Sequence, residues 1–203
     1  MPRSFLATLA AAAVTLLAAF PAQAAGPYPD KPITLLIPYP PGGSADILAR
    51  PLGAALQKKW GQPVVLEYKP GAGGAIASSQ LARAKPDGYT LLMVLAAHAI
   101  NPSLYPSLPY DTRRDFAPVS LVATLPMLVS APLATPADNI PDLIAYAKSH
   151  PGKLSFASAG NGNTSHLAAE MFKARTGTDM MHVPYKGSGP AVVALLGLSL
   201  IHI

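Results

Sequence analysis

The chain has 203 residues, a formal net charge of +5 at pH 7 and no cysteine. The positive charge is too small and too scattered for a nucleic-acid-binding surface, because basic residues come at most in the pairs Lys58-Lys59 and Arg113-Arg114. Without cysteine the chain can have no disulfide, no thiolate chemistry and no cysteine-ligated metal site.

Residues 1–24 have the pattern of a secretory signal peptide. Arg3 supplies a positive start, an apolar stretch of alanine and leucine runs from Phe5 to Phe20, and Ala22-Gln23-Ala24 is a cleavage site of small residues. A membrane anchor is the alternative, but it needs about 20 apolar residues, and this stretch is shorter. We therefore expect export with cleavage after Ala24, and a soluble mature protein, since no second apolar stretch reaches spanning length.

Residues 33–46 predict a strand, a tight loop and the start of a helix. Ile33 to Ile37 is a continuous apolar run, which is typical of a strand buried on both faces of a parallel sheet. Prolines and glycines follow, and the helix begins through Ser44. Free N–H groups and the helix dipole at such a junction favour phosphate, sulfate or carboxylate. The alternative is an ordinary strand-to-helix turn with Ser44 as its N-cap.

The helix that follows should end at Gly61 and should be kinked, or lose one hydrogen bond, at Pro51. Its apolar positions recur with a helical period and are Ile47, Leu48, Leu52, Ala55 and Leu56. A second strand (residues 64–68), a glycine-rich loop (69–75) and a helix ending near Lys85 repeat the construction, and a third strand follows at 90–95. Strands alternating with helices predict an α/β fold with a parallel sheet and right-handed crossovers.

Prolines at positions 102, 106, 109 and 118 should interrupt any helix between residues 101 and 118, so this stretch is predicted to connect two lobes over the surface. We place the first lobe at residues 25–118 and the second at 119–203. In the second lobe we expect strands at 119–124 and 127–130, a helix at 140–149 capped by Asn139, and a strand at 154–157. A glycine-rich loop then leads into a helix ending at Gly177, and a strand at 181–184 precedes a helix from Ala191. The apolar residues 198–203 follow without further strands to cover them, so the second lobe is expected to be incomplete.

Catalytic and metal-binding motifs are largely missing. The chain contains neither a phosphate-binding loop ending in Gly-Lys-Ser/Thr nor a Gly-x-Ser-x-Gly elbow, and residues 71–74 do not form a dinucleotide fingerprint. No two histidines are three or four residues apart, and neither a metal nor another cofactor is predicted.

Several side chains allow two interpretations. Asp46 lies in the first helical turn and either stabilises the helix dipole or contacts a ligand. His166 is either a residue of a capping turn or a ligand contact, and His98 is either a packed loop residue or a ligand contact. Tyr39 and Tyr185 both precede glycine-rich loops and are either surface packing or a pair of rings that closes over a ligand.

Five motifs occur in order along the chain: residues 39–46 (YPPGGSAD), 69–74 (KPGAGG), 86–91 (PDGYTL), 101–105 (NPSLY) and 183–187 (VPYKG). Together they resemble the Bug family, the TctC-like periplasmic substrate-binding receptors of tripartite tricarboxylate transporters. The resemblance implies a two-lobed periplasmic binding protein fold, type II-like, that closes on a carboxylate ligand and delivers it to a membrane permease. Members of the family are longer, so the resemblance also implies a C-terminally truncated chain.

By position, the resemblance places three stretches of the first lobe and two of the second around the ligand. The candidate ligand-binding residues are Tyr39, Gly42, Gly43, Ser44, Asp46, Gly73, Gly74, Ala75, His98, Ser158, Gly160, Asn161, Thr164, Ser165, His166 and Tyr185. The implied ligand is a di- or tricarboxylate, an acidic amino acid or an aromatic acid, held by backbone amides and small hydroxyls.

Two other functions remain as alternatives. An exported α/β hydrolase could use Ser158 or Ser165 with His166, provided that a nucleophile, a base and an orienting acid come within hydrogen-bond reach. A structural envelope protein without a ligand is the third possibility.

Overall fold

The structure is a computed structural model, and it describes residues 26–197 and 201–202. The predicted signal peptide and its cleavage site therefore lie outside the described residues. All helices and strands discussed below belong to the compact unit Lys31–Ile203.

The first sheet has three parallel strands in the order β2-β1-β3, with β1 (Ile33–Ile37) between β2 (Val64–Tyr68) and β3 (Thr90–Leu92). Four of the five residues of β1 are buried, which confirms the prediction of a strand covered on both faces. The third strand is shorter than predicted. Because β1 is followed by Pro38, which has no N–H to donate, the ladder ends with the Met93 N–H donating to the Leu36 carbonyl at 3.0 Å.

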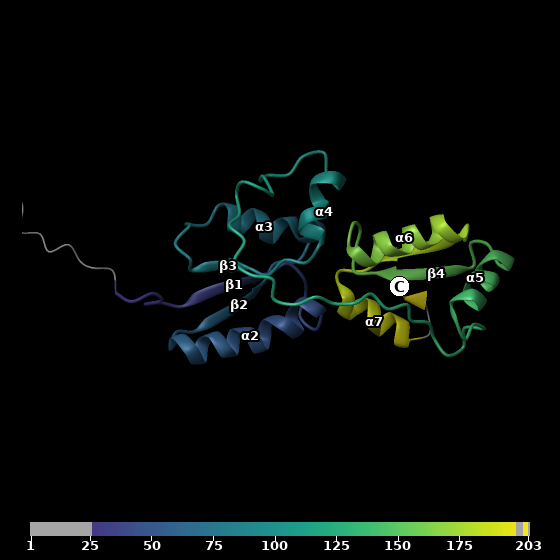
Figure 1. The fold of residues 1–203 in the computed structure, drawn as a ribbon, viewed down its shortest axis with the longest axis horizontal. Coiled ribbons are helices and arrows are strands. Elements are labelled where there is room, and N and C mark those ends of the chain that lie inside the picture. The colour runs from purple at the N-terminus through teal and green to yellow at the C-terminus, as the bar shows by residue number, and fades with distance from the viewer. Residues whose placement is uncertain (1–25, 198–200, 203) are drawn as a thin grey trace, which may run out of the picture. The chain divides into compact units, whose positions relative to one another are not determined.

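Helices cover both faces of this sheet (Figure 1). α2 (Ser44–Trp60) lies on one face and α3 (Ala75–Ala82) on the other, preceded by the short helix η1 (Ala72–Gly74). α2 contains Pro51 and ends at Gly61, whose φ is +70°, and both features were predicted. The helix ends because Gly61 adopts the left-handed conformation that glycine tolerates without steric cost.

The apolar stripe of α2 is only partly buried. Ile47 is 66% exposed and Ala55 is exposed, whereas Ala45, Ala49 and Gly53 are buried. A Cβ on Gly53 would lie 3.5 Å from side-chain atoms of Leu66 and Val64, so α2 packs closely on β2 through its smallest residues. Close approach of helix and sheet selects small side chains, and hydrophobicity alone does not reveal that.

α4 (Ala97–Leu104) contains Pro102 in its interior, contrary to the prediction that this proline interrupts any helix. A proline at this position lacks the N–H that would bond to the carbonyl of His98. The helix continues for two residues, and the Tyr105 N–H donates to the Asn101 carbonyl at 2.9 Å. The loss of one hydrogen bond near the end of a short helix is therefore tolerated.

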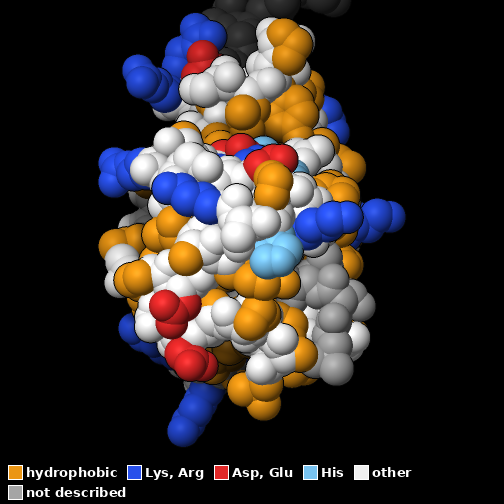
Figure 2. Space-filling view, turned by 90° about the vertical axis from the view of Figure 1, so that its right-hand side faces the viewer, with side chains coloured by type: hydrophobic (Ala, Val, Ile, Leu, Met, Phe, Trp, Pro, Cys, Tyr) orange, Lys and Arg blue, Asp and Glu red, His pale blue; other side chains and the backbone are white. Residues whose placement is uncertain are grey.

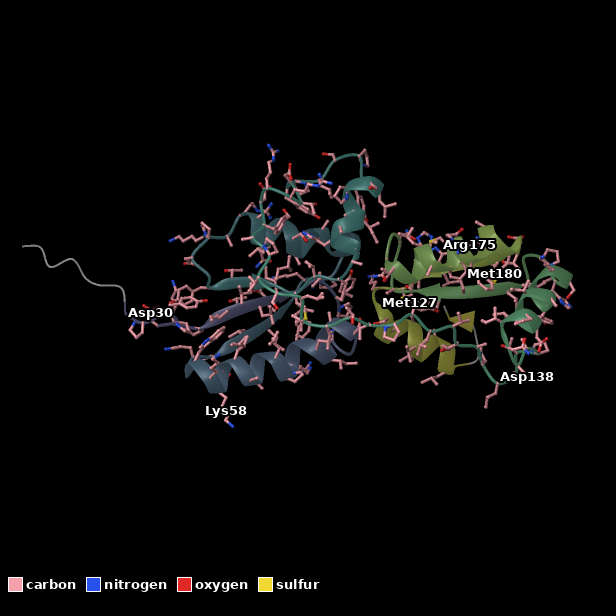
Figure 3. The ribbon with its side chains drawn as sticks, in the orientation of Figure 1. Asp30, Lys58, Met127, Asp138, Arg175 and Met180 are labelled. Carbon is pink, nitrogen blue, oxygen red and sulfur yellow. The ribbon has the colours of Figure 1, made fainter. Side chains whose placement is uncertain are left out.

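The predicted strands at 119–124 and 127–130 are also wrong. The chain forms no ladder here among the described residues, and only an isolated bridge occurs at Ser130. Val119 is 84% exposed and Leu121 is 79% exposed, and Met127 lies in the same stretch (Figure 3). Apolar residues raise strand propensity, but a strand exists only where a neighbouring chain pairs with it.

The second sheet repeats the arrangement of the first. Its strand order is β5-β4-β6, with β4 (Leu154–Ser158) between β5 (Met180–Pro184) and β6 (Ile201–His202), all parallel. β6 corrects the expectation that the final apolar residues find no partner strand. Figure 1 shows α6 (Thr164–Thr176) and α7 (Ser188–Leu196) on opposite faces of β4, with α5 (Ile140–Ser149) nearby.

Most helix ends around the second sheet were predicted correctly from neighbouring residues in the sequence. The Asn139 side chain accepts a hydrogen bond from the Asp142 N–H at 2.9 Å, as expected of an N-cap, and Gly177 ends α6 with a φ of +64°. α7 begins at Ser188 rather than at Ala191, because Pro190 is acceptable in a first turn.

Each sheet has its own apolar core. The first is built from Leu35, Ile37, Tyr39, Ala45, Ala49 and Met93. The second is smaller and is built from Phe156, Ala169 and Met180. Lys58 projects from the outer side of α2 (Figure 3), and on the face shown in Figure 2 lysine and arginine side chains are interspersed with apolar and acidic ones.

Candidate functional site

The loop between β1 and α2, residues 38–43, is the first element of the site and is called the α2 entry loop. Gly42 has a φ of +82°, and Gly43 is the N-cap of α2. The alternative interpretation had Ser44 as the N-cap, but Ser44 is the first helical residue, and the N-cap Gly43 has no side chain that could cap the helix. The loop is held instead from the next turn, since the Asp46 carboxylate accepts the Gly42 N–H at 2.8 Å.

Asp46 is only 4% exposed, and its carboxylate is occupied by the protein. Besides Gly42, it accepts hydrogen bonds from the Tyr68 hydroxyl and from Arg50, whose Nε lies 2.9 and 3.0 Å from the two carboxylate oxygens. Burial alone would raise the pKa of Asp46, but the hydrogen bonds from Tyr68, Gly42 and Arg50 outweigh it and lower the pKa. A buried carboxylate that already accepts from three donors of the protein has little capacity left for a ligand, so the ligand-contact interpretation of Asp46 is not supported.

The loop between β4 and α6, residues 159–163, is the second element and is called the α6 entry loop. Gly160 and Gly162 have φ values of +125° and +73°, and Asn163 is the N-cap, accepting the Ser165 N–H at 3.3 Å. The Asn163 amide nitrogen also donates to the Tyr39 hydroxyl at 3.4 Å. Asn163 was not among the predicted site residues, although asparagine directly before a helix is a recognisable N-cap signal.

Two predicted serines support the α6 entry loop from within. Ser158 is fully buried, and its Oγ accepts the Gly160 N–H at 3.1 Å, while the Ser165 Oγ accepts the Ala159 N–H at 3.1 Å. Asn161 is exposed, and the Thr164 Oγ1 donates to Asn163 at 3.1 Å. These serines therefore stabilise the loop through hydrogen bonds to its backbone.

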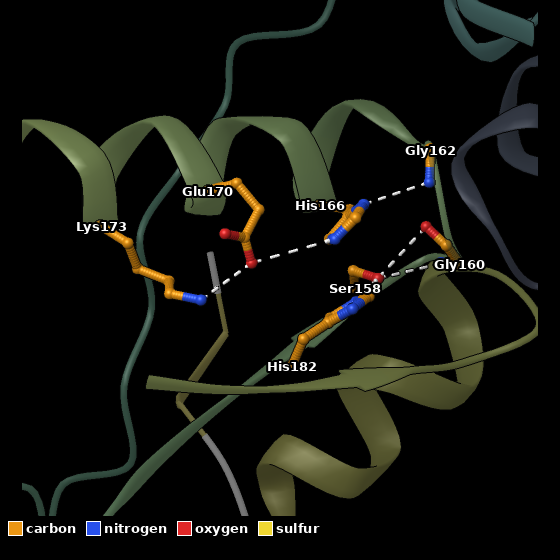
Figure 4. Close-up of polar contacts among 7 residues, drawn as sticks. All are labelled: Ser158, Gly160, Gly162, His166, Glu170, Lys173 and His182. Carbon is orange, nitrogen blue, oxygen red and sulfur yellow. Dashed lines mark hydrogen bonds and ion pairs between the residues drawn. The ribbon is translucent and has the colours of Figure 1, made fainter. Parts of the chain in front are cut away.

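Two stacked histidines lie behind the same loop (Figure 4). The rings of His166 and His182 are 4.0 Å apart and nearly parallel at 16°, and Phe156 stacks on His182 at 4.9 Å. The Gly162 N–H donates to His166 Nδ1 at 3.2 Å, and His182 Nε2 lies 2.6 Å from the Ser158 Oγ. Burial, together with the neighbouring His166, lowers the pKa of His182. His182 was missed because its contacts arise from the pairing of β4 with β5.

The loop between β5 and α7 contacts the α2 entry loop. The Ser44 N–H donates to the Ser188 Oγ at 3.3 Å, and a Cβ on Gly187, whose φ is +124°, would lie 3.2 Å from Pro40. Tyr185 is half-buried, and its N–H donates to the Ser158 carbonyl at 3.0 Å. Ser188 was not predicted as a site residue, because its contact with Ser44 joins two helix starts that are 144 residues apart in the sequence.

Tyr39 contacts the α6 entry loop through its hydroxyl group. Its side chain is 8% exposed, and burial raises the pKa of the phenol although the hydrogen bond from Asn163 opposes this shift. The structure thus brings Tyr39 to the junction of the two loops, while no contact between the rings of Tyr39 and Tyr185 is formed among the described residues.

The glycines after β2 serve close packing. Gly73 and Gly74 have φ values of +59° and +91°, and a Cβ on Gly74 would lie 3.1 Å from Pro38. The Asn101 side chain donates to the Gly73 carbonyl at 3.1 Å, and its own Oδ1 is buried without a hydrogen-bond partner among the described residues. Ala75, the first residue of α3, is buried.

His98 is a packed residue of α4. Its Nδ1 lies 3.0 Å from the Ser78 Oγ, and its ring stacks on Tyr110 at 5.9 Å and meets the edge of Phe116 at 4.7 Å. Burial lowers the pKa of His98. The packed interpretation of His98 therefore agrees with the structure, and the ligand contact is not supported.

The helix starts offer hydrogen-bond donors. Within the described part of the chain, the first-turn N–H groups of Ala45 and Asp46 in α2, and of Thr164 and His166 in α6, have no hydrogen-bond partner. Such groups, with the positive end of the helix dipole, favour an anion. The Tyr39–Asn163 and Ser44–Ser188 hydrogen bonds link the loops that lead into α2, α6 and α7.

Other kinds of site find little support. Within residues 26–197 and 201–202, no three histidine, aspartate or glutamate side chains gather in a way that could hold a metal ion. The hydrolase alternative required Ser158 or Ser165 beside His166, whereas Ser158 contacts His182 and is fully buried. A depression of about 420 Å³ near the end of α2 is lined by residues outside the predicted site, Ala54, Gln57, Lys58, Gly61 and Pro63. None of the helices in the described part of the chain combines the length and the apolar character needed to span a membrane.

The model of the tripartite tricarboxylate transporter family receptor matches residues 48–202. BugT of Bordetella pertussis is 44% identical over 172 residues, covering 84% of this chain and 53% of BugT. The chain spans about half the length of such relatives.

Solved structures agree with this assignment. The R. palustris protein Rpa4515 with adipate has a TM-score of 0.83 at 36% identity, over 86% of this chain and 58% of that protein. The periplasmic binding protein BugD has a TM-score of 0.76 at 36% identity, over 86% and 58% of the two chains. MatC from Rhodopseudomonas palustris with bound malate has a TM-score of 0.79 at 34% identity, over 86% and 60%. With its parallel α/β sheets, the chain has the fold of periplasmic binding proteins, and it belongs to the tripartite tricarboxylate transporter receptor family.

Proposed function

We propose that the full-length protein containing this chain is an extracytoplasmic solute receptor that captures an organic carboxylate and delivers it to a membrane permease. The observation that carries the proposal is the meeting of the α2 and α6 entry loops, linked by the Tyr39–Asn163 hydrogen bond. Each loop leads into a helix whose first-turn N–H groups are available to an anion. The family name supports transport, and the bound adipate and malate of the two R. palustris proteins support a dicarboxylate.

The energetics of such a site are sufficient. A hydrogen bond to a charged group contributes about 1.5–3 kcal/mol, so four or five bonds would approach the roughly 8 kcal/mol of a micromolar complex. The donors proposed are the N–H groups of Ala45, Asp46, Thr164 and His166. Backbone donors recognise the carboxylate group itself and leave the remainder of the ligand to other contacts, so the proposal names a class of ligand.

The same proposal includes the organisation of the chain. Residues 1–24 would direct export to the periplasm, residues 25–118 would form the first lobe, and residues 119–203 would belong to the second. The two three-stranded sheets, one before and one after residues 119–130, support this division.

A thermal-shift experiment on the full-length protein tests the function. Malate, adipate, citrate, glutamate and benzoate would be added singly, with the uncharged diamide of adipate as a control. At a ligand concentration a hundredfold above its dissociation constant we expect a stabilisation of about 2.7 kcal/mol from at least one acid and none from the diamide. If no acid raises the melting temperature, the receptor function is contradicted, and a structural envelope protein becomes the better account.

A further inference from the structure

The α2 and α6 entry loops are fastened in the same way by different residues. In each loop a glycine with positive φ, Gly42 or Gly162, stands two residues before the helix, and its N–H is accepted by a side chain four residues later. Asp46 accepts the Gly42 N–H at 2.8 Å, and His166 Nδ1 accepts the Gly162 N–H at 3.2 Å. Both acceptors are the third residue of their helix.

The two acceptors differ in how they respond to acid. The Asp46 carboxylate, with its several hydrogen bonds, remains ionised above about pH 4. It can therefore accept the Gly42 N–H throughout that range. An imidazole gains a proton in the range of about pH 5 to 8. Protonated histidine carries N–H donors on both nitrogens and cannot accept from Gly162.

We propose that His166 is a positioning residue that holds the α6 entry loop in its anion-binding shape only while its imidazole is neutral, so that carboxylate binding weakens on mild acidification. The proposal rests on the proposed function for its effect on binding. The hydrogen bond itself and its loss in acid can be tested without any ligand.

Two elements, β5 and α6, place titratable or charged groups next to His166. His182 of β5 stacks on it at 4.0 Å, so a charge on one ring opposes a charge on the other. On α6, Glu170 approaches His166 Nε2 at 3.9 Å, but Lys173 already pairs with Glu170 at 3.0 Å (Figure 4). Glu170 is therefore partly neutralised, and it lies beside Nε2 rather than the Nδ1 that accepts from Gly162.

The His182 ring also supports the α6 entry loop, through Ser158. His182 Nε2 contacts the Ser158 Oγ, which in turn accepts the Gly160 N–H. The two rings thus fasten two glycines of one loop, and burial together with the neighbouring His166 lowers the pKa of His182. Charging either ring disturbs the pair.

The test follows the backbone amide of Gly162 by NMR between pH 8 and pH 5 in the full-length protein without ligand. In the wild type we expect its shift to follow a titration, whereas the Gly42 amide, bonded to Asp46, should stay constant. In His166→Asn the side-chain oxygen stands where Nδ1 was and can accept without titrating, so the Gly162 amide should stay constant too. An unchanged Gly162 amide in the wild type, or the same titration in His166→Asn, would overturn the proposal.

The effect on binding is measured with malate at pH 7.5 and pH 5.5, with adipate as a second probe. The wild type should lose affinity by at most roughly tenfold between pH 7.5 and pH 5.5, the fold-change that corresponds to one hydrogen bond, and His166→Asn should lose less than twofold. At pH 7.5 His166→Asn should bind more tightly than His166→Ala, which lacks the acceptor at every pH. His150→Asn, on the exposed end of α5, is the matched control and should behave as the wild type.

The two hypotheses fail separately. If neither acid binds at any pH, the receptor function fails while the NMR titration still decides whether His166 fastens the loop. If malate binds with the same affinity at both pH values in the wild type, the coupling of the histidine to the site is refuted and the receptor function stands.

Discussion

Asp46 illustrates how a residue that looks like a ligand contact can serve the loop instead. Its carboxylate receives the Gly42 N–H, the Tyr68 hydroxyl and the Arg50 guanidinium, and the side chain is almost fully buried. The sequence indicates a helix-start carboxylate, but Tyr68 comes from another strand. The role of Asp46 therefore depends on its contact with Tyr68, which the spacing of residues along the chain does not reveal.

We expect Asp46→Asn to lower the free energy of unfolding by roughly 2 kcal/mol, because it weakens charged hydrogen bonds in a buried site. Chemical denaturation at pH 7 measures the loss. Asp138→Asn, at an exposed position, is the matched control and should change stability by less than about 0.5 kcal/mol.

The pH dependence of this stabilisation has a definite sign. Because the pKa of Asp46 is lower in the folded protein than its usual value, its contribution is present above about pH 4 and is lost as the pH falls through the folded-state pKa. The stability difference between wild type and Asp46→Asn should therefore shrink below pH 4. A difference that stays constant from pH 7 to pH 3 would contradict the assignment.

Gly160 combines a positive φ with close neighbours. A Gly160→Val change looks, from the sequence, like a means of filling the ligand space without harming the fold. In the structure Gly160 has a φ of +125°, and a Cβ there would lie 3.2 Å from the Tyr185 carbonyl, so any side chain strains the loop.

Gly160→Ala should consequently destabilise the protein by about 2–3 kcal/mol, because the backbone conformation is unfavourable for an L side chain and a backbone oxygen is close. Gly177→Ala, with a φ of +64° and open space around its Cβ, should cost only about 1 kcal/mol. Thermal unfolding of the two variants compares the costs, and equal losses would show that the crowding at Gly160 has no energetic effect.

At the scale of elements, the two asparagine N-caps allow effects on stability and on binding to be tested separately. Asn139 caps α5 and Asn163 caps α6, each through a side-chain oxygen that accepts a first-turn N–H. Only Asn163 also contacts Tyr39. The two asparagines are thus a matched pair, alike in capping and different in their place relative to the site.

Replacing either asparagine by alanine should cost about 1 kcal/mol of stability. Carboxylate affinity, measured by calorimetry on the full-length protein, should fall in Asn163→Ala and remain at the wild-type value in Asn139→Ala. A loss of affinity common to both variants would mean that the effect reflects general destabilisation and that the α6 entry loop has no special role.

The sequence predicted elements well where the signals are local. The β1 strand, the left-handed glycines that end α2 and α6, and the Asn139 cap all depend on residues within a few positions of one another. The predicted strands at 119–130 failed because apolar composition cannot reveal whether a partner strand is present. His182 and Ser188 were missed for the same reason, since their contacts with Ser158 and Ser44 join distant parts of the chain.

At the scale of the whole molecule, the two sheets have the same arrangement of strand, glycine-rich loop and helix. Two parallel sheets, each with helices entered through glycine-rich loops, give two sets of helix-start amides, and the Ser44–Ser188 hydrogen bond joins parts of the chain 144 residues apart. The chain spans about half the length of its relatives. One of the five family motifs, residues 39–46, contains the start of α2, whereas the α6 entry loop lies outside all five.

A crystal structure of the full-length protein with the acid that gives the largest thermal shift tests the central claim most directly. The account predicts a carboxylate oxygen within about 3.2 Å of first-turn N–H groups of α2 or α6, among them those of Ala45, Asp46, Thr164 and His166. A ligand bound with its carboxylate elsewhere, or held mainly by lysine and arginine side chains, would contradict the account.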